Sequence, residues 1–125
     1  MLLVIAEKDP NELDTLLSAL ESPDREIVVV EDGNNIVTLA LKRSPDVVVV
    51  GSSIGHMGGF AVARELKMRQ DEGTIGEVKV IVLLERSADE WLAGWSRCDA
   101  FLTKPVDPLD VDDLVRELTG AAANS

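Results

Sequence analysis

One short segment of the chain carries the residue types of a nucleophilic site. Residues 51–55, Gly-Ser-Ser-Ile-Gly, fit the G-x-S-x-G pattern of a hydrolase nucleophile elbow, in which Ser53 would be the nucleophile. That serine would need a histidine base held by an acid. The single histidine, His56, lies only three residues further on, too close to fold back as the base of Ser53. We therefore interpret the segment as a Gly- and Ser-rich loop, and we expect no enzyme activity.

The sequence also lacks the usual phosphate-binding motifs. It contains neither G-x-x-x-x-G-K-[ST] nor G-x-G-x-x-G, and residues 7–10, Glu-Lys-Asp-Pro, stand where a flavin-binding protein would carry Ser, Thr or Gly. His56 and Met57 have no partner ligand at a useful spacing. The single Cys98 supports neither an internal disulfide nor a zinc site. We therefore expect no cofactor and no metal ion.

Charge restricts the range of partners. The chain has 125 residues, 46% of them hydrophobic, and a formal net charge of −11. Such an acidic chain repels nucleic acid and anionic lipid. Its first residues do not resemble a signal peptide, and it contains no apolar run near the roughly 20 residues that a membrane span needs. We expect a cytoplasmic protein with one domain over residues 1–120, followed by a flexible tail or linker start over residues 121–125.

The hydrophobic pattern predicts alternating strands and helices. Five short apolar runs are typical of parallel strands buried on both faces. Between them, apolar residues recur at helical spacing, and Asp9-Pro10 and Asp107-Pro108 mark two helix starts, with Glu12 as a capping-box acid. The expected strands cover residues 2–6, 27–30, 47–50, 80–84 and 100–103, and the expected helices begin near 10, 34, 59, 87 and 108.

This order predicts a doubly wound α/β fold. Five βα units with right-handed crossovers give a three-layer (βα)5 sandwich around a five-stranded parallel sheet. Functional groups of such folds lie at the carboxyl ends of the strands. Here these ends carry residues 7–9, 51–53, 84–85 and 104–105.

Residues at these strand ends resemble the receiver domain of two-component response regulators, the CheY-like family. The resemblance rests on residues 2–10, 45–59, 79–85 and 101–105, in the expected order and at the expected spacing. Its most specific part is Lys104-Pro105 after a strand that carries Phe101. The resemblance implies the CheY-like (flavodoxin-like) fold and a place in bacterial two-component-type signal transduction.

The chemistry that the resemblance implies is phosphoryl transfer to an aspartate. In the family, this aspartate and an acidic pair after the first strand hold Mg²⁺, while a hydroxyl and a lysine contact the phosphoryl oxygens. Glu7 and Lys104 match two of these positions. Lys8 replaces the second acid, Gly51 the phospho-accepting aspartate and Leu84 the hydroxyl. Counting Glu7, Lys8 and Lys104 gives this pocket a net charge of +1, which disfavours Mg²⁺.

Two tryptophans suggest a role in binding. Trp91 and Trp95 lie four residues apart and share one face of a regular helix. They are either core residues or exposed anchors for a partner. The resemblance places the output surface of the family on the fourth helix, fifth strand and fifth helix, which also includes Phe101.

These observations predict a pseudo-receiver, a protein-interaction module that does not use aspartyl phosphorylation. Lys104 would pair with Glu7 in place of the missing aspartate. Two alternatives stay open: a sensor that binds a small anion with Lys8, Lys104 and the loop from Gly51 to Gly59, and a phosphotransfer receiver with an unorthodox acceptor. The expected partner is a protein, with a homodimer as a further alternative.

Overall fold

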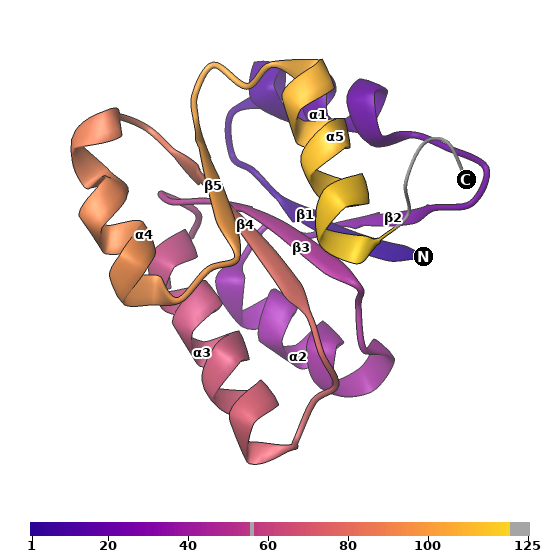
Figure 1. Cartoon of the computed structure of the whole chain (residues 1–125), viewed down its shortest axis with the longest axis vertical. Helices are drawn as coiled ribbons and strands as arrows, with labels where there is room; N and C mark the ends of the chain where they lie inside the picture. Colours follow the sequence, from indigo (N-terminus) through magenta and orange to yellow (C-terminus); the bar gives the residue numbers. More distant parts are fainter. Residues whose placement is uncertain (56, 121–125) are drawn as a thin grey trace.

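The computed structural model shows a five-stranded parallel sheet in the order β2-β1-β3-β4-β5. It describes residues 1–55 and 57–120, so the predicted tail 121–125 and His56 lie outside the described residues. The twisted sheet runs through the middle of the molecule (Figure 1). Its strands are β1 (Leu2–Ala6), β2 (Glu26–Val29), β3 (Val47–Gly51), β4 (Lys79–Leu84) and β5 (Ala100–Thr103).

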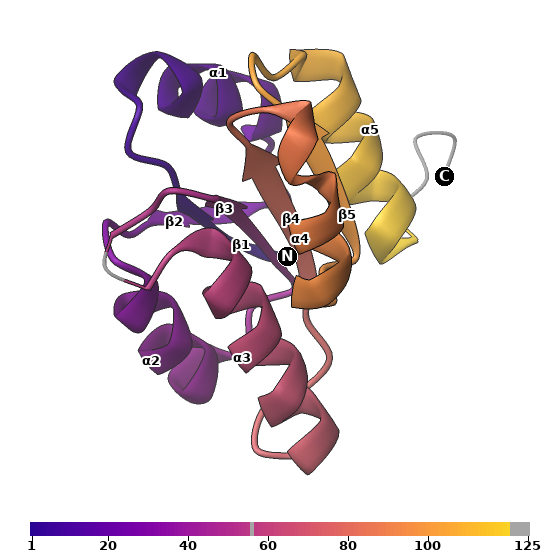
Figure 2. The ribbon, with the colours of Figure 1, turned by 90° about the vertical axis from the view of Figure 1, so that its left-hand side faces the viewer.

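Helices cover both faces of the sheet. α1 and α5 lie on one face, and α2, α3 and α4 lie on the other (Figures 1 and 2). A three-residue 3₁₀ helix, Ser87–Asp89, precedes α4. The helices are α1 (Pro10–Leu20), α2 (Gly33–Arg43), α3 (Gly59–Glu72), α4 (Glu90–Ser96) and α5 (Pro108–Thr119).

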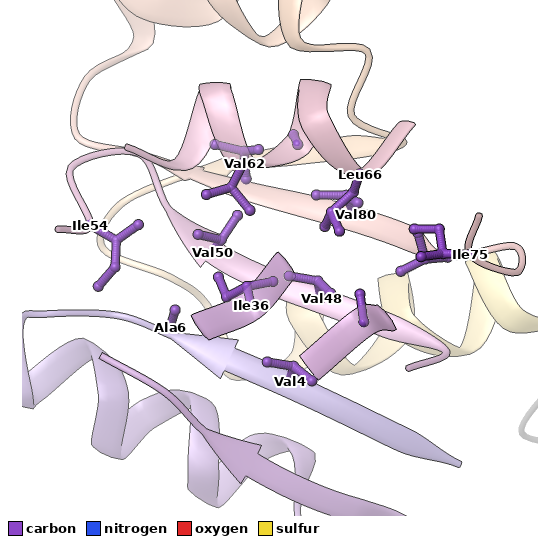
Figure 3. Close-up of a cluster of buried hydrophobic side chains, with 14 of the residues drawn as sticks. Val4, Ala6, Ile36, Val48, Val50, Ile54, Val62, Leu66, Ile75 and Val80 are labelled. Carbon is purple, nitrogen blue, oxygen red and sulfur yellow. The ribbon is translucent and has the colours of Figure 1, made fainter. Parts of the chain in front are cut away.

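The core consists of two apolar layers separated by the sheet. One layer joins alternate residues of β1, β3 and β4 to α2 and α3, including Ile36, Val62 and Leu66 (Figure 3). The other joins the remaining strand residues to Leu16 of α1 and Val111 of α5. Because the central strands are buried on both faces, they can be apolar at every position.

The predicted fold is confirmed, with local differences. Only β1, β3 and β4 are buried along nearly their whole length; the prediction that β2 and β5 are buried on both faces was wrong, because these are the edge strands. The helix expected near residue 87 is divided into a 3₁₀ turn and a short α-helix. α3 begins at Gly59 as predicted, continues to Glu72 and ends where Gly73 adopts a left-handed conformation.

The helix starts at Asp9 and Asp107 are confirmed, but the capping box is not. Both aspartates accept hydrogen bonds from backbone N–H groups of the first helical turn. Glu12 does not reach back to the N–H of Asp9; its carboxylate accepts a hydrogen bond from the Val106 N–H, 3.2 Å away. The Asp9 N–H instead donates to Glu7. Among the described helices, none is long and apolar enough to cross a membrane.

Candidate functional site

The candidate site lies at the carboxyl edge of the sheet, where four strands end side by side. Glu7 follows β1, Gly51 ends β3, Glu85 follows β4 and Lys104 follows β5. The parallel register brings these ends together, with Ala6 paired to Val50 and Gly51 paired to Leu83. Residues distant in the sequence therefore form one cluster, which we call the strand-end cluster: Glu7, Gly51, Glu85 and Lys104.

Lys104 connects two carboxylates in this cluster. Its Nζ atom lies 2.7 Å from Oε2 of Glu7 and 2.7 Å from Oε2 of Glu85. The side chain of Glu7 is completely buried and that of Lys104 is 9% exposed, whereas that of Glu85 is 43% exposed. Burial lowers the pKa of Lys104, but the hydrogen bonds and charges of the two glutamates outweigh it, so the pKa lies above the ordinary lysine value. Lys104 is therefore a bound ammonium ion.

Glu7 fills the space beside Gly51. A Cβ atom added to Gly51 would lie closer than 3.0 Å to Oε1 of Glu7, which real Cβ atoms essentially never do. The Oε2 atom of Glu7 accepts hydrogen bonds from Lys104 and from the Asp9 N–H, at 2.7 and 2.9 Å. Among the described residues, Oε1 of Glu7 is the single buried side-chain N or O atom without a hydrogen-bond partner. Position 51 thus has no room for a side chain while Glu7 keeps this position.

Two further residues of the predicted pocket are Lys8 and Leu84. Lys8 is exposed. Leu84 is fully buried in the core layer beneath α2 and α3. Sequence reasoning placed Glu85 at this edge but gave it no role in the pocket. The predicted net charge of +1 counted Glu7, Lys8 and Lys104; with Glu85 added, two negative and two positive charges sum to zero.

The predicted Gly-rich loop begins one residue later than expected, because Gly51 still belongs to β3. A Cβ atom on Gly59, the first residue of α3, would lie closer than 3.0 Å to the backbone of Gly51 and Ser52. Glycine at position 59 therefore allows α3 to start directly against the end of β3. His56 lies outside the described residues.

The two tryptophans lie on the outer side of α4. Trp91 is 70% exposed and Trp95 is 48% exposed, so neither is a core residue. The guanidinium of Arg64 in α3 stacks over the Trp95 ring, 4.7 Å from its centroid, and donates a 2.7 Å hydrogen bond to the Trp95 carbonyl. Trp95 therefore packs toward α3. Phe101 lies on the edge strand β5 and is 39% exposed. It pairs in register with Val82 of β4.

The chain resembles response regulators in sequence. No protein-family model matches it. An uncharacterized response regulatory protein of Mycobacterium tuberculosis is 31% identical over 102 residues, which cover 82% of this chain and 74% of that protein. The chain belongs to the response regulator receiver family.

Solved receiver structures agree with this assignment. The signal receiver domain of a histidine kinase from Syntrophus aciditrophicus is 25% identical, with a TM-score of 0.80 over 99% of this chain and 93% of that one. The receiver domain of Saccharomyces cerevisiae Ssk1, crystallised with the histidine phosphotransfer protein Ypd1, gives a TM-score of 0.84 at 16% identity, covering 96% of this chain and 89% of that one. The likeness to Ssk1 concerns the fold alone.

Proposed function

We propose that this receiver is a pseudo-receiver: a protein-interaction module in two-component-type signalling that works without aspartyl phosphorylation and is not an enzyme. The observation that carries the proposal is the geometry at Gly51, the position that matches the family's phospho-accepting aspartate. Glycine has no carboxylate to phosphorylate, and Glu7 occupies the space where such a side chain would begin.

The residues present do not fit the Mg²⁺ ion that the family uses. Mg²⁺ prefers several oxygen ligands in octahedral geometry. Gly51 supplies no side-chain oxygen, Lys8 replaces an acid, and one oxygen of Glu7 already accepts from Lys104 and Asp9. Leu84, at the matching hydroxyl position, is fully buried. In this proposal, the strand-end cluster therefore carries out no phosphoryl transfer.

The same contacts weigh against the two alternative functions. An anion sensor would need Lys104 to bind the anion, yet two carboxylates already surround its ammonium. An unorthodox acceptor such as Ser52 or Ser53 would need a base and a metal ion. The buried carboxylate beside Gly51, that of Glu7, is already ion-paired with Lys104.

We place the partner-binding surface on the fourth helix, with Trp91 as its most exposed aromatic anchor. Large aromatic residues dominate the energy of many protein interfaces. Phe101 on β5 extends the proposed surface from the fourth helix onto the fifth strand and toward the fifth helix. The partner is a protein, or a second copy of this chain, and the net charge of −11 favours a basic partner surface over nucleic acid.

Incubation with acetyl phosphate and Mg²⁺, followed by intact mass measurement, tests the proposal. We expect no phosphate adduct on the wild-type protein or on Gly51→Asp alone. The triple variant Glu7→Asp, Lys8→Asp, Gly51→Asp shortens the obstructing carboxylate and restores both acids, and it is the variant in which we expect a hydroxylamine-labile adduct. A Mg²⁺-dependent, hydroxylamine-labile phosphate on the wild type or on Gly51→Asp would contradict the proposal.

Trp91→Ala tests the interaction surface. The variant should melt within about 2 °C of the wild type, because exposed substitutions usually change stability by less than about 0.5 kcal/mol. In a pull-down from the native cell, it should lose the partner that the wild type retains. Leu41→Ala is a matched control, since Leu41 is 48% exposed but belongs to α2, outside the proposed surface. If Trp91→Ala kept the partner, the surface would be wrongly placed.

A further inference from the structure

We infer that the ion pair between Glu85 and Lys104 fixes the first half of α4, and with it Trp91, to the sheet. Glu85 is the first residue after β4, and the chain continues from it through the 3₁₀ turn Ser87–Asp89 into α4. Its carboxylate lies 2.7 Å from Nζ of Lys104 after β5. We call this pair the α4 anchor. It goes beyond the proposed function, because it would hold α4 whether or not a partner binds.

The start of α4 is otherwise weakly fixed. Neither Arg86 before the 3₁₀ turn nor Asp89 before α4 forms a side-chain capping hydrogen bond. Asp89 instead pairs with Arg86, 3.3 Å away within the same turn. Among the described residues, we find no side-chain hydrogen bond or ion pair from residues 86–92 to any other element. Helix starts normally need such partners. The α4 anchor is the side-chain tie nearest to this end, and it stands beside the backbone hydrogen bond from the Lys104 N–H to the Leu84 carbonyl, at 2.9 Å.

The end of α4 is fixed independently of the anchor. Arg64 of α3 donates to the Trp95 carbonyl at 2.7 Å. Arg97, which follows α4, pairs with Asp71 of α3 at 2.8 Å. α4 is therefore attached to α3 near Trp95 and to the sheet through Glu85 on the side of Trp91. Loss of the anchor should loosen only the first half of the helix.

Lys104 provides a rigid base for the anchor because it is also bound to the buried Glu7. Glu85, by contrast, is 43% exposed, so removing its carboxylate leaves no buried charge. The side-chain ions of the strand-end cluster thus hold the end of β4, the strand that leads into α4. They do so at the place where the family uses a phosphoryl group. The position of Trp91 would be preset by the sequence.

Hydrogen–deuterium exchange of the full chain tests this inference with Glu85→Ala. We expect peptides covering residues 86–92 to exchange about three- to fivefold faster, as loss of an exposed ion pair of up to about 1 kcal/mol predicts. Peptides of β3 and of α3 should be unchanged. The matched control is Glu77→Ala, which breaks the ion pair with Lys79, the first residue of β4, and should leave residues 86–92 unaffected.

Two results would overturn the inference. In the first, residues 86–92 exchange at the wild-type rate in Glu85→Ala. In the second, exchange rises uniformly across the chain, which would mean that Glu85 supports global stability and not α4. Both readouts are made on the free protein, so failure here is distinguishable from failure of the proposed function, which is measured by phosphate adducts and partner capture.

Discussion

Two lysines whose side chains are less than 10% exposed lie at opposite ends of β4 and β5, and their surroundings differ. At the amino ends of these strands, Lys67 of α3 pairs with Asp99 at 2.7 Å and donates to the Val78 carbonyl at 2.6 Å. The same Asp99 oxygen accepts the Val80 N–H at 2.7 Å. At the carboxyl ends, Lys104 pairs with Glu7 and Glu85. Both lysines connect elements distant in the sequence.

The difference is how completely each cluster satisfies its buried polar atoms. The partners of Lys67 are a backbone carbonyl and a carboxylate that also accepts a backbone N–H, so this cluster stabilises the join between α3 and the sheet. The Lys104 cluster leaves Oε1 of Glu7 buried without a partner, which costs free energy. This atom lies at the edge of the sheet where folds of this class place their functional sites.

The largest effect is expected for Lys67→Met. The variant leaves Asp99 without its cation and the Val78 carbonyl without a donor, so the free energy of unfolding should fall by about 3–5 kcal/mol. Urea unfolding measures it. Lys79→Met is the control, since its partner Glu77 is 70% exposed and the loss should stay below about 1 kcal/mol. A loss as small as that of the control would show that the Lys67 cluster is not structural.

The next effect is the coupling between Lys104 and Glu7. Lys104→Met alone should cost about 3 kcal/mol, because it leaves the buried Glu7 carboxylate without a cation. Adding Glu7→Gln removes that charge and should recover about half of the loss. A double-mutant cycle by urea unfolding gives the coupling energy, which we expect at about 1–3 kcal/mol. Strictly additive losses would show that the pair does not interact.

A smaller effect is expected for Gly51→Ala. The new methyl group would collide with Glu7, and overpacking of this kind costs about 1–3 kcal/mol. Gly76→Ala is the matched control, since a Cβ there has no atom within 4 Å, and its effect should stay within about 0.5 kcal/mol. Equal effects in the two variants would mean that Glu7 moves away from Gly51 without cost.

The smallest effect concerns alkaline pH. The raised pKa of Lys104 means that its contribution to stability is present below the unfolded-state pKa and is lost as pH rises through the folded-state pKa. From about pH 10 upward, the wild type should therefore lose stability more steeply than the Lys104→Met, Glu7→Gln double variant. Urea unfolding between pH 8 and 11.5 measures both slopes. The comparison is best made in a Lys79→Met background, because the pKa of Lys79 is raised as well. Identical slopes would contradict the prediction.

Much of the site could be predicted because it depends on order along the chain. Glu7, Gly51 and Lys104 each follow or end an apolar strand, and parallel strands of one sheet end at one edge. The pairing of Lys104 with Glu7 was predicted and is present at 2.7 Å. The role of Glu85 was missed because it depends on side-chain reach across β4 and β5, and Glu12 was assigned to a capping box because its tertiary partner, Val106, lies 94 residues away.

Local periodicity was enough to predict the alternation of strands and helices and the doubly wound α/β fold, and the resemblance to receivers then marked position 51 as lacking the aspartate. Three features needed the folded chain: Glu7 fills the space beside Gly51, Lys104 binds two carboxylates, and both tryptophans are exposed. Burial and ion pairing depend on atoms that folding brings together from distant segments, so they do not follow from local patterns. Helical spacing predicted that Trp91 and Trp95 share one face, but only the packing of α4 beside α3 leaves Trp91 the more exposed of the two and brings Arg64 over the Trp95 ring.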